Sequence, residues 1–272
     1  MIKLTDEEFT RLCSFMSSSY GINLTKKRVL IEYRLMNELS RWKVTSFQEY
    51  LNMVKQDVTG KMKEELINRI TTNYTFFMRE STHFQYIKDK ILPASDPKRP
   101  FPIWIAGCSS GQECYTLAME LEDQRRAGHT LPDITITATD ISTKMLQQAK
   151  AASYPIEALE TLPEEWRKRY CTRSSDEKTF QIDPVITRQV KFQYHNLMDP
   201  FKPYQFQLIM CRNVMIYFDE TSRSKILDHF HHSLKDRGYL ILGHAEVIPY
   251  TNQKFQYHGS SIYQKKARSA YE

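Results

Sequence analysis

A short apolar run followed by a glycine-containing turn is the feature that most constrains how this chain can fold. Residues 103–106 are apolar, the turn after them holds Gly107 and Gly111, and a helical pattern follows. A second apolar run, 134–138, leads to Asp140. Strand, small-residue turn, helix and a strand that ends on an acid form the pattern of a nucleotide-binding sheet, in which the acid accepts hydrogen bonds from ribose hydroxyls. The sequence therefore predicts a doubly wound α/β domain that binds a nucleoside.

The spacing of the turn narrows the choice of nucleoside. Gly107 and Gly111 are four residues apart, which is not the G-x-G-x-x-G of dinucleotide sites, and Glu113 lies just inside the following helix. A carboxylate at this position repels a pyrophosphate, so a dinucleotide fits poorly. A ligand with an adenosine and a cationic end fits better. We therefore expect S-adenosylmethionine, the common ligand of that kind, as the cofactor.

Composition favours a globular protein of the cytoplasm. The 272 residues contain no run of eighteen apolar residues, so we expect no membrane span, and the first residues lack the apolar segment of a secretory signal. Five cysteines without a C-x-x-C pair are typical of reduced cytoplasmic thiols. Cys108 and Cys114 lack paired His or Cys partners, so we expect no metal site. The net charge of +6 leaves nucleic acid or an acidic protein open as a partner.

The periodicity divides the chain into two parts. Residues 5 to about 90 carry helical signals, beginning with a capping box at Thr5 and Glu8. The segment 91–100 holds three prolines and is typical of a domain boundary. We therefore predict an all-helical domain over residues 1–92 and an α/β domain over residues 93–272, which would bind the S-adenosylmethionine. Within the first domain the predicted helices are the one that follows Thr5 and those at 26–42, 46–55 and 61–72.

Alternating strands and helices after residue 101 predict a mostly parallel sheet. Ser142 and Asp219 are suited to cap two of its helices. Two β-like runs, 179–182 and 190–194, fit this rhythm poorly, and we expect them to form a small antiparallel insertion at about 171–195. The predicted strands are 102–106, 134–138, 206–210 and 238–243, the predicted helices are 112–127, 142–151 and 219–235, and a final antiparallel pair is expected around 255–257 and 261–263.

Four motifs in a fixed order identify a family. They are T-T-N-Y-T-F-F-M-R-E at 71–80, A-G-C-S-S-G-Q-E-C-Y-T at 106–116, A-T-D-I at 138–141 and C-R-N-V-M-I-Y-F at 211–218. A G-H-A-E sequence at 243–246 follows them. Together they resemble the CheR family of chemotaxis methyltransferases over nearly the whole chain. The resemblance implies a Rossmann-like methyltransferase fold and transfer of a methyl group from S-adenosylmethionine to glutamate side chains of chemoreceptors.

The resemblance also implies functional residues. Arg79 and Tyr217 would lie nearest the transferred methyl group, and Arg79 is suited to bind either the substrate carboxylate or the carboxylate of the cofactor. One departure from the family is Cys114, where proline is usual; that position needs no hydrogen-bond donor. The residues that the resemblance places against the cofactor are Asn73, Thr75, Arg79, Glu113, Asp140, Asn196, Leu197, Arg212 and Asn213.

A basic stripe predicts where the substrate docks. Lys27, Arg34 and Arg41 recur every seven residues, so they share one face of the predicted helix at 26–42. Such a stripe is often only a solvated face. The resemblance, however, implies a substrate in the acidic helical cytoplasmic region of chemoreceptors, which the stripe would attract. The turn at 173–178 lacks the glycine that some family members use to grip a receptor peptide. We therefore expect a monomer that works without such a tether.

Two rival functions share the predicted cofactor. A nucleic-acid methyltransferase would suit the positive charge, but the loop after the strand at 206–210 reads Cys-Arg-Asn-Val instead of the N-P-P-Y type that holds a base. A non-catalytic adaptor that senses S-adenosylmethionine is the other rival, and retention of Arg79 and Tyr217 argues against it. We expect neither a nucleic-acid partner nor direct insertion into a membrane.

Overall fold

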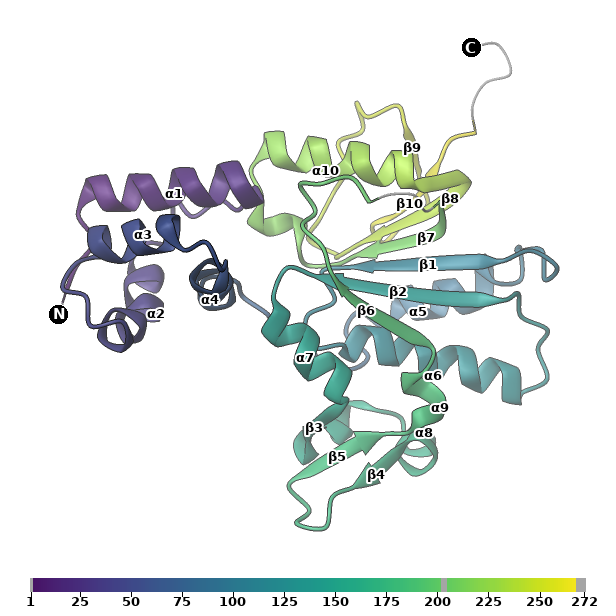
Figure 1. The fold of residues 1–272 in the computed structure, drawn as a ribbon. Helices are drawn as coiled ribbons and strands as arrows, with labels where there is room; N and C mark the ends of the chain where they lie inside the picture. Colours follow the sequence, from purple (N-terminus) through teal and green to yellow (C-terminus); the bar gives the residue numbers. More distant parts are fainter. Residues whose placement is uncertain (1, 202–204, 268–272) are drawn as a thin grey trace.

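Four helices form the N-terminal part of the chain (Figure 1). The computed structural model describes residues 2–201 and 205–267. The predicted capping box is present: the Thr5 hydroxyl accepts from the Glu8 amide at 3.2 Å, and the Glu8 carboxylate accepts from the Thr5 amide at 2.7 Å. The predicted helices are confirmed as α1 (Asp6–Tyr20), α2 (Arg28–Arg41), α3 (Phe47–Gln56) and α4 (Lys61–Ile70).

A connecting segment leads from these helices to the sheet. It contains α5 (Thr82–Tyr86) and a π-helical turn, η1 (Ile87–Ile91). Phe77, Phe84 and Ile87 are buried in the same hydrophobic cluster as residues of the central sheet. The segment before the proline-rich stretch thus packs with the α/β part of the molecule. We therefore propose a domain boundary near residue 72 instead of residue 92.

A seven-stranded sheet lies at the centre of the larger part (Figure 1). Its strands follow the order β6-β2-β1-β7-β8-β10-β9. The first five are parallel, and β10 is antiparallel to both β8 and β9. The predicted α/β sheet and its final antiparallel pair are confirmed. The strands are β1 (Phe101–Ala106), β2 (Ile134–Asp140), β6 (Val190–Tyr194), β7 (Phe206–Cys211), β8 (Leu234–Leu242), β9 (Phe255–Tyr257) and β10 (Ile262–Lys265).

The predicted pairing of residues 190–194 with residues 179–182 is wrong. Residues 190–194 form β6, which lies parallel to β2 at the edge of the main sheet, with Val190 opposite Ile136. A parallel partner far away in the chain leaves no local signal, whereas two nearby β-like runs resemble a hairpin. The small antiparallel sheet exists, but its order is β3-β5-β4. Its strands are β3 (Ser153–Pro155), β4 (Cys171–Arg173) and β5 (Thr179–Ile182).

Helices cover both faces of the main sheet (Figure 1). On one face lies α10 (Glu220–Ser233), and on the other lie α6 (Gln112–Arg126) and α7 (Thr143–Ala151). As predicted, Ser142 and Asp219 cap α7 and α10, since their side chains accept from the amides of Met145 and Ser222. The short helices are η2 (Ile156–Thr161), α8 (Glu164–Tyr170), α9 (Pro184–Thr187) and η3 (Met215–Tyr217). Over the described ranges, no helix is both long and apolar enough to cross a membrane.

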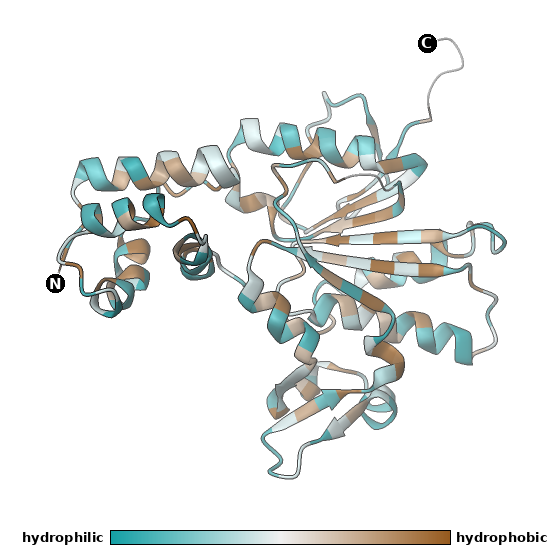
Figure 2. Cartoon of the chain, viewed as in Figure 1, coloured by the Kyte–Doolittle hydropathy of each residue, from teal (hydrophilic) through white to brown (hydrophobic). Residues whose placement is uncertain are grey.

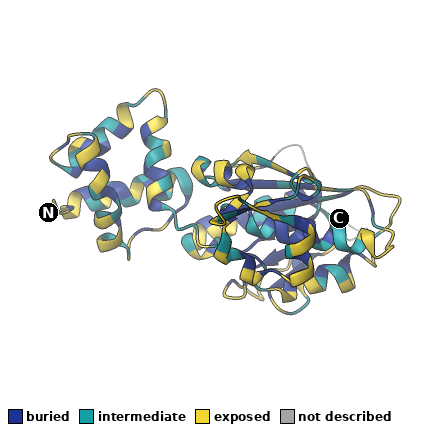
Figure 3. Cartoon of the chain, turned by 90° about the horizontal axis from the view of Figure 1, so that it is seen from below, coloured by how far each residue is buried: buried dark blue, intermediate teal, exposed yellow. Residues whose placement is uncertain are grey.

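Two hydrophobic clusters occupy the two faces of the sheet. Along β1, Trp104 belongs to one cluster, and its neighbours Ile103 and Ile105 belong to the other, as alternation along a strand requires. The cluster that contains Trp104 continues into the helical part, where Leu12 and Leu35 belong to it. Figure 2 shows apolar residues concentrated in the strands, and Figure 3 shows buried residues inside both parts. The helical part is thus held against the sheet by a shared core.

Candidate cofactor pocket

One pocket lies where the carboxyl ends of β1, β2, β6 and β7 meet. This is the edge at which parallel α/β sheets bind ligands. It contains about 990 Å³ of space not filled by atoms, open solvent included. Tyr20, Leu24 and Lys27 reach it from the helical part. It is lined by all ten residues assigned above to the cofactor and the reaction: Asn73, Thr75, Arg79, Glu113, Asp140, Asn196, Leu197, Arg212, Asn213 and Tyr217.

The turn after β1 needs its first glycine. Gly107 has φ +81°, and a Cβ atom added there would lie 2.5 Å from Cγ2 of Val214. A larger residue would therefore suffer both backbone strain and a collision. Val214 belongs to the loop that follows β7. The absence of a side chain at Gly107 therefore lets this loop pack closely against the turn after β1. The glycine-containing turn thus brings two strand ends together at the pocket.

Asp140 lies at the end of β2 as a buried carboxylate. Its Oδ2 accepts from the Ser109 amide at 2.7 Å, and its Oδ1 accepts from the Ser142 amide at 2.8 Å. Burial raises the pKa of Asp140, although both hydrogen bonds act in the opposite direction. The carboxylate is therefore fixed in orientation by the turn after β1 and by the N-terminus of α7. A carboxylate can accept about four hydrogen bonds, so Asp140 retains acceptor capacity for a ligand hydroxyl.

Arg212 is a fully buried guanidinium group at the end of β7. It donates to Glu113 Oε2 at 3.0 Å and to Glu80 Oε2 at 3.1 Å, and it also donates to the carbonyl oxygen of Arg79. Its guanidinium carbon lies 5.2 Å from the centre of the Phe84 ring. These contacts use most of the N–H donors of Arg212 on the protein itself. Arg212 therefore lines the pocket while it positions Glu113, and a direct bond from it to the cofactor is not required.

Glu113 is the second carboxylate of the pocket. Burial raises its pKa, and the nearby Arg212 acts to lower it. Glu80 responds differently: burial acts to raise its pKa, but Arg212 and the side chain of Asn213 together hold that pKa below the ordinary value. Glu113 is thus the carboxylate of this pair whose charge is less well compensated. A cationic ligand in the pocket would stabilise it.

Arg79 differs from Arg212 in having few partners. Its Nη1 donates to the Tyr74 carbonyl oxygen at 2.7 Å. Its guanidinium carbon lies 5.7 Å from the centres of both the Tyr74 and the Phe76 rings. Both aromatic side chains are solvent-exposed. The two rings therefore restrict the guanidinium group while leaving most of its donors available at the pocket.

The predicted asparagines have mixed roles. Asn73 donates to the Thr71 hydroxyl at 3.2 Å, and its carbonyl oxygen accepts from the Ser109 hydroxyl at 3.0 Å. Asn196 donates to the Ser19 carbonyl oxygen at 2.9 Å, so its amide joins α1 to the loop after β6. Asn213 has φ +60°, and its Nδ2 donates to Glu80 at 3.2 Å. These side chains fix the walls of the pocket as well as facing it.

The three residues of the predicted basic stripe have separate positions. Lys27 lines the pocket, and its Nζ lies 4.5 Å from the centre of the Tyr217 ring. Arg34 donates to the carbonyl oxygens of Ile70 and Thr71 at 2.6 and 3.3 Å. Its guanidinium group therefore binds the end of α4 within this protein. Arg41 has a 54% exposed side chain and pairs with Glu65 at 3.3 Å. Of the three residues, only Arg41 is exposed to solvent as the docking prediction requires; Lys27 and Arg34 are partly buried.

Several residues of the site were not predicted from the sequence. Glu246 is buried, and its carboxylate accepts from the amides of Gly243, Asn213 and Ile216 at 2.7, 2.8 and 3.2 Å, so it fixes the loop that carries Tyr217. The G-H-A-E motif was the only signal for it. Glu80, the partner of Arg212, lies in the first motif. Tyr20 and Leu24 carry no signal, because their approach to the pocket depends on how the helical part docks.

Comparisons with known proteins assign the two parts separately. Residues 73–264 match the family model described as CheR methyltransferase, SAM binding domain. Residues 7–71 match the model described as CheR methyltransferase, all-alpha domain. The division between the two matches agrees with a boundary near residue 72. The first match covers every pocket residue from Asn73 onward. The pocket residues before Asn73 lie outside it.

Related proteins resemble the chain over nearly its full length. The chemotaxis protein methyltransferase of Borreliella burgdorferi is 38% identical in an alignment of 273 residues that covers 97% of this chain and 96% of the relative. Chemotaxis protein methyltransferase 1 of Vibrio cholerae is 35% identical and covers 94% of each chain. The chemotaxis protein methyltransferase of Escherichia coli is 32% identical and covers 96% of this chain and 92% of the relative. The chain therefore belongs to the CheR family of chemotaxis protein methyltransferases, and its cofactor is S-adenosylmethionine.

Proposed function

We propose that the chain methylates glutamate side chains of chemoreceptors and forms glutamate methyl esters. The observation that carries this proposal is the availability of Arg79. Among the described residues, its guanidinium group donates only to the Tyr74 carbonyl oxygen and forms no ion pair with a carboxylate. An unpaired guanidinium group at a pocket is suited to bind a carboxylate, with two parallel hydrogen bonds in the best geometry. The substrate glutamate and the methionyl end of the cofactor each present a carboxylate.

The carboxylates of the pocket suit the rest of the cofactor. Asp140 would accept from the ribose hydroxyls, since its oxygens are held at the strand end by two backbone amides. Glu113 would face the cationic end, where a positive charge offsets the burial of its carboxylate. Asn73, Thr75, Asn196, Leu197 and Asn213 would complete the contacts, as the family resemblance implies. Arg212 would act on the cofactor through Glu113.

The reaction requires alignment more than proton transfer. Bound S-adenosylmethionine supplies an electrophilic methyl group on a sulfonium sulfur. Methyl transfer to a glutamate carboxylate would form a carbon–oxygen bond as the sulfur–carbon bond breaks. No proton would have to be removed, because a nucleophile of pKa about 4.3 is already ionised at neutral pH. A positive and a negative charge disappear together, which favours a site with little water. Positioning of the two groups supplies up to about 7–11 kcal/mol in ideal cases.

Tyr217 is suited to position the substrate carboxylate. It lies in η3, at the pocket, and its carbonyl oxygen accepts from the Asn23 amide at 2.8 Å. Its ring is held beside Lys27 of the helical part. Its hydroxyl would donate to one carboxylate oxygen while Arg79 holds the other. The other arrangement, in which Arg79 binds the methionyl carboxylate, leaves Tyr217 as the main contact to the substrate.

The exposed surface of α2 is our candidate for receptor docking in the cytoplasm. Arg41 is exposed there, and the apolar side chains of Val29 and Tyr33 are 78% and 76% exposed. Apolar contacts flanked by a cation suit an acidic amphipathic helix. We propose that the acidic helical region of a chemoreceptor lies along this face, next to the pocket wall that Lys27 contributes.

The direct test is transfer of a labelled methyl group from S-adenosylmethionine to receptor-containing membranes. Treatment of the product with mild base should release the label as methanol, which identifies a carboxyl ester. Base-stable label would identify another acceptor, and label in added nucleic acid would favour the rival methyltransferase. Cofactor binding without any incorporation would favour the adaptor. Any of these three results would contradict the proposal.

Variants of Arg79 decide its role. If Arg79 binds the substrate, Arg79→Met should raise KM for the receptor and leave the affinity for S-adenosylhomocysteine, measured by calorimetry, unchanged. If it binds the cofactor carboxylate, that affinity should fall. Arg99→Met is the matched control, because Arg99 is exposed and distant from the pocket lining. An Arg79 variant with control-like values in both assays would remove Arg79 from the site.

A further inference from the structure

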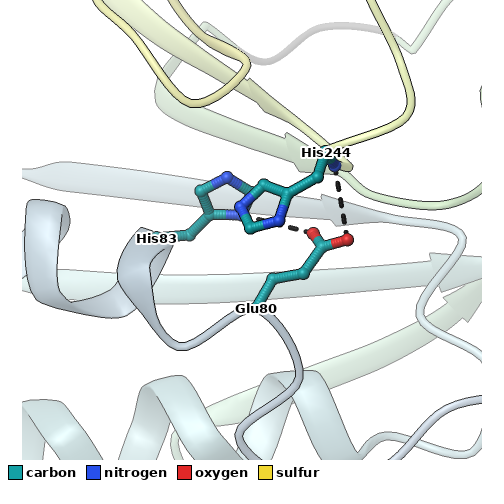
Figure 4. Close-up of side chains that lie close together, drawn as sticks. All are labelled: Glu80, His83 and His244. Atoms are coloured by element: carbon teal, nitrogen blue, oxygen red, sulfur yellow. Dashed lines mark hydrogen bonds and ion pairs between the residues drawn. The ribbon is translucent and has the colours of Figure 1, made fainter.

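Three potential metal ligands from two segments of the chain lie together beside the pocket (Figure 4). Glu80 and His83 are three residues apart at the start of α5, and His244 follows β8. One ligand atom from each lies within 4.8 Å of the other two. We propose that these three side chains bind a divalent transition-metal ion, with Zn²⁺ as the representative case. The expectation of no metal site rested on the cysteines, whereas this cluster exists only in the folded chain.

The buried ring of His83 is the strongest evidence. Its side chain is fully buried, and its Nε2 lies 2.7 Å from the carbonyl oxygen of Ser260. A carbonyl oxygen only accepts, so Nε2 carries the proton and Nδ1 presents a lone pair. That Nδ1 lies 3.6 Å from Glu80 Oε2 and has no hydrogen-bond partner among the residues described. The unpartnered lone pair of Nδ1 and the Glu80 oxygen face each other in a buried place, an arrangement that suits a cation between them.

The surroundings of the ring match those of metal ligands. A histidine that binds a metal through one nitrogen usually donates its other N–H to a backbone carbonyl, as His83 donates to Ser260. His244 completes the set from the solvent side: it is exposed, and its ring centre lies 4.7 Å from that of His83. An ion can therefore enter past His244. Two imidazoles and one carboxylate leave further coordination positions for water, and imidazole selects zinc and similar ions over magnesium and calcium.

The local charge permits a cation despite the neighbouring Arg212. Glu80, Glu113 and Glu246 provide three carboxylates in this region, and Arg79 and Arg212 provide two guanidinium groups. If all five groups are ionised, they carry one net negative charge before any metal binds. Arg212 approaches Glu80 Oε2 at 3.1 Å, and the His244 amide approaches Oε1 at 3.3 Å. A metal at the face toward His83 would share the carboxylate with Arg212.

Sharing of Glu80 links this site to the cofactor pocket. Glu80 orients Arg212, and Arg212 orients Glu113 in the pocket. An ion bound to the Glu80 carboxylate would change the contact between Glu80 and Arg212. By linkage, metal and cofactor should then alter each other's affinity by the same factor. This consequence can be measured without any methyl transfer.

The test is calorimetric titration of the full chain with Zn²⁺. We expect one ion per chain in the wild type and a loss of affinity of at least about 10-fold in His244→Ala, since removing a ligand should cost no less than removing an outer-shell partner. His244 is exposed, so this variant should fold; its circular dichroism would verify that. His129→Ala is the matched control, because His129 is also exposed but lies in the loop after α6. Equal binding by His244→Ala and wild type, or no binding by wild type, would overturn the proposal.

Two further measurements exclude other ligands. Titration with Co²⁺ should give a spectrum of nitrogen and oxygen ligation, whereas an intense sulfur-to-metal band would place the ion at a cysteine and overturn the assignment. Mg²⁺ should fail to compete with Zn²⁺, since it disfavours imidazole ligands. Effective competition by Mg²⁺ would show carboxylate binding elsewhere on the surface.

Discussion

The Nζ atom of Lys27 lies 4.5 Å from the centre of the Tyr217 ring. This contact joins the helical part to the loop after β7, where backbone contacts between Asn23 and Tyr217 and between Ile22 and Phe218 add to it. Burial lowers the pKa of Lys27, and the charge of Arg34 acts in the same direction. Lys27 is thus a partly buried cation of the pocket wall. The helical part therefore completes the site as well as presenting a docking face.

Lys27→Ala should slow methyl transfer about 3- to 10-fold, because a cation–π contact of about 0.5–2 kcal/mol would no longer hold the Tyr217 ring. The affinity for S-adenosylhomocysteine should change less than the rate. Steady-state kinetics with receptor membranes, combined with calorimetry, would separate the two effects. Lys26→Ala is the control for the loss of one positive charge, because Lys26 is exposed. Equal rates for the two variants would mean that Lys27 acts only through its charge.

Arg34 and Arg41 should behave differently. Arg34→Met removes the donors to the carbonyl oxygens of Ile70 and Thr71, so it should lower both thermal stability and cofactor affinity, with a loss of about 1–3 kcal/mol for the stranded acceptors. Arg41→Glu should leave cofactor affinity unchanged but slow methylation at low salt and flatten its salt dependence. Melting curves, calorimetry and rates at two salt concentrations test both. If Arg41→Glu matches the wild type at low salt, the charge on this face has no role in docking.

Cofactor affinity should fall in acid through Asp140. Burial raises the pKa of Asp140, so the ionised form that accepts from the ribose is lost at a higher pH than for an ordinary aspartate. The effect on the stability of the cofactor-free protein has the opposite sign. Because the folded state binds this proton more tightly, the group costs stability above its folded-state pKa, and this cost disappears as the pH falls through that pKa toward the unfolded value.

Calorimetry with S-adenosylhomocysteine between pH 8 and pH 5 would measure the effect. The wild-type affinity should be constant at the upper end and decrease toward the lower end, and Asp140→Ala should bind about 1–3 kcal/mol more weakly with a smaller pH dependence. Asp133→Ala is the control, because Asp133 is an exposed acid just before the first residue of β2. Unchanged affinity in Asp140→Ala would exclude Asp140 from the ribose site.

Gly107→Ala should destabilise the protein more than Gly128→Ala. Both positions have positive φ, +81° and +84°, so both variants should lose about 1–2 kcal/mol through backbone strain. At Gly107 the new Cβ also meets Val214 at 2.5 Å, whereas at Gly128 nothing lies within 4 Å. The collision should add about 1–3 kcal/mol. Denaturant unfolding of both variants measures the difference, and equal losses would show that Val214 moves away without cost.

The local elements of the fold could be predicted because their signals lie within a few residues of each other. The capping box at Thr5, the caps at Ser142 and Asp219 and the glycine turn before α6 are all decided by neighbours in the chain. The motif residues were assigned to the cofactor through their resemblance to a family. The structure then places all ten of them around one pocket.

The sequence by itself thus determined the long helices, the strands of the main sheet, the order of the motifs and the kind of ligand, since these depend on periodicity and on residue types at fixed spacing. Only the tertiary structure decided that β6 pairs with β2, that Arg34 bonds to the end of α4 and that Glu80 and His83 meet His244. Each of these contacts joins residues that are far apart in the chain. Their geometry follows from how the sheet and the helical part pack, which no local pattern encodes.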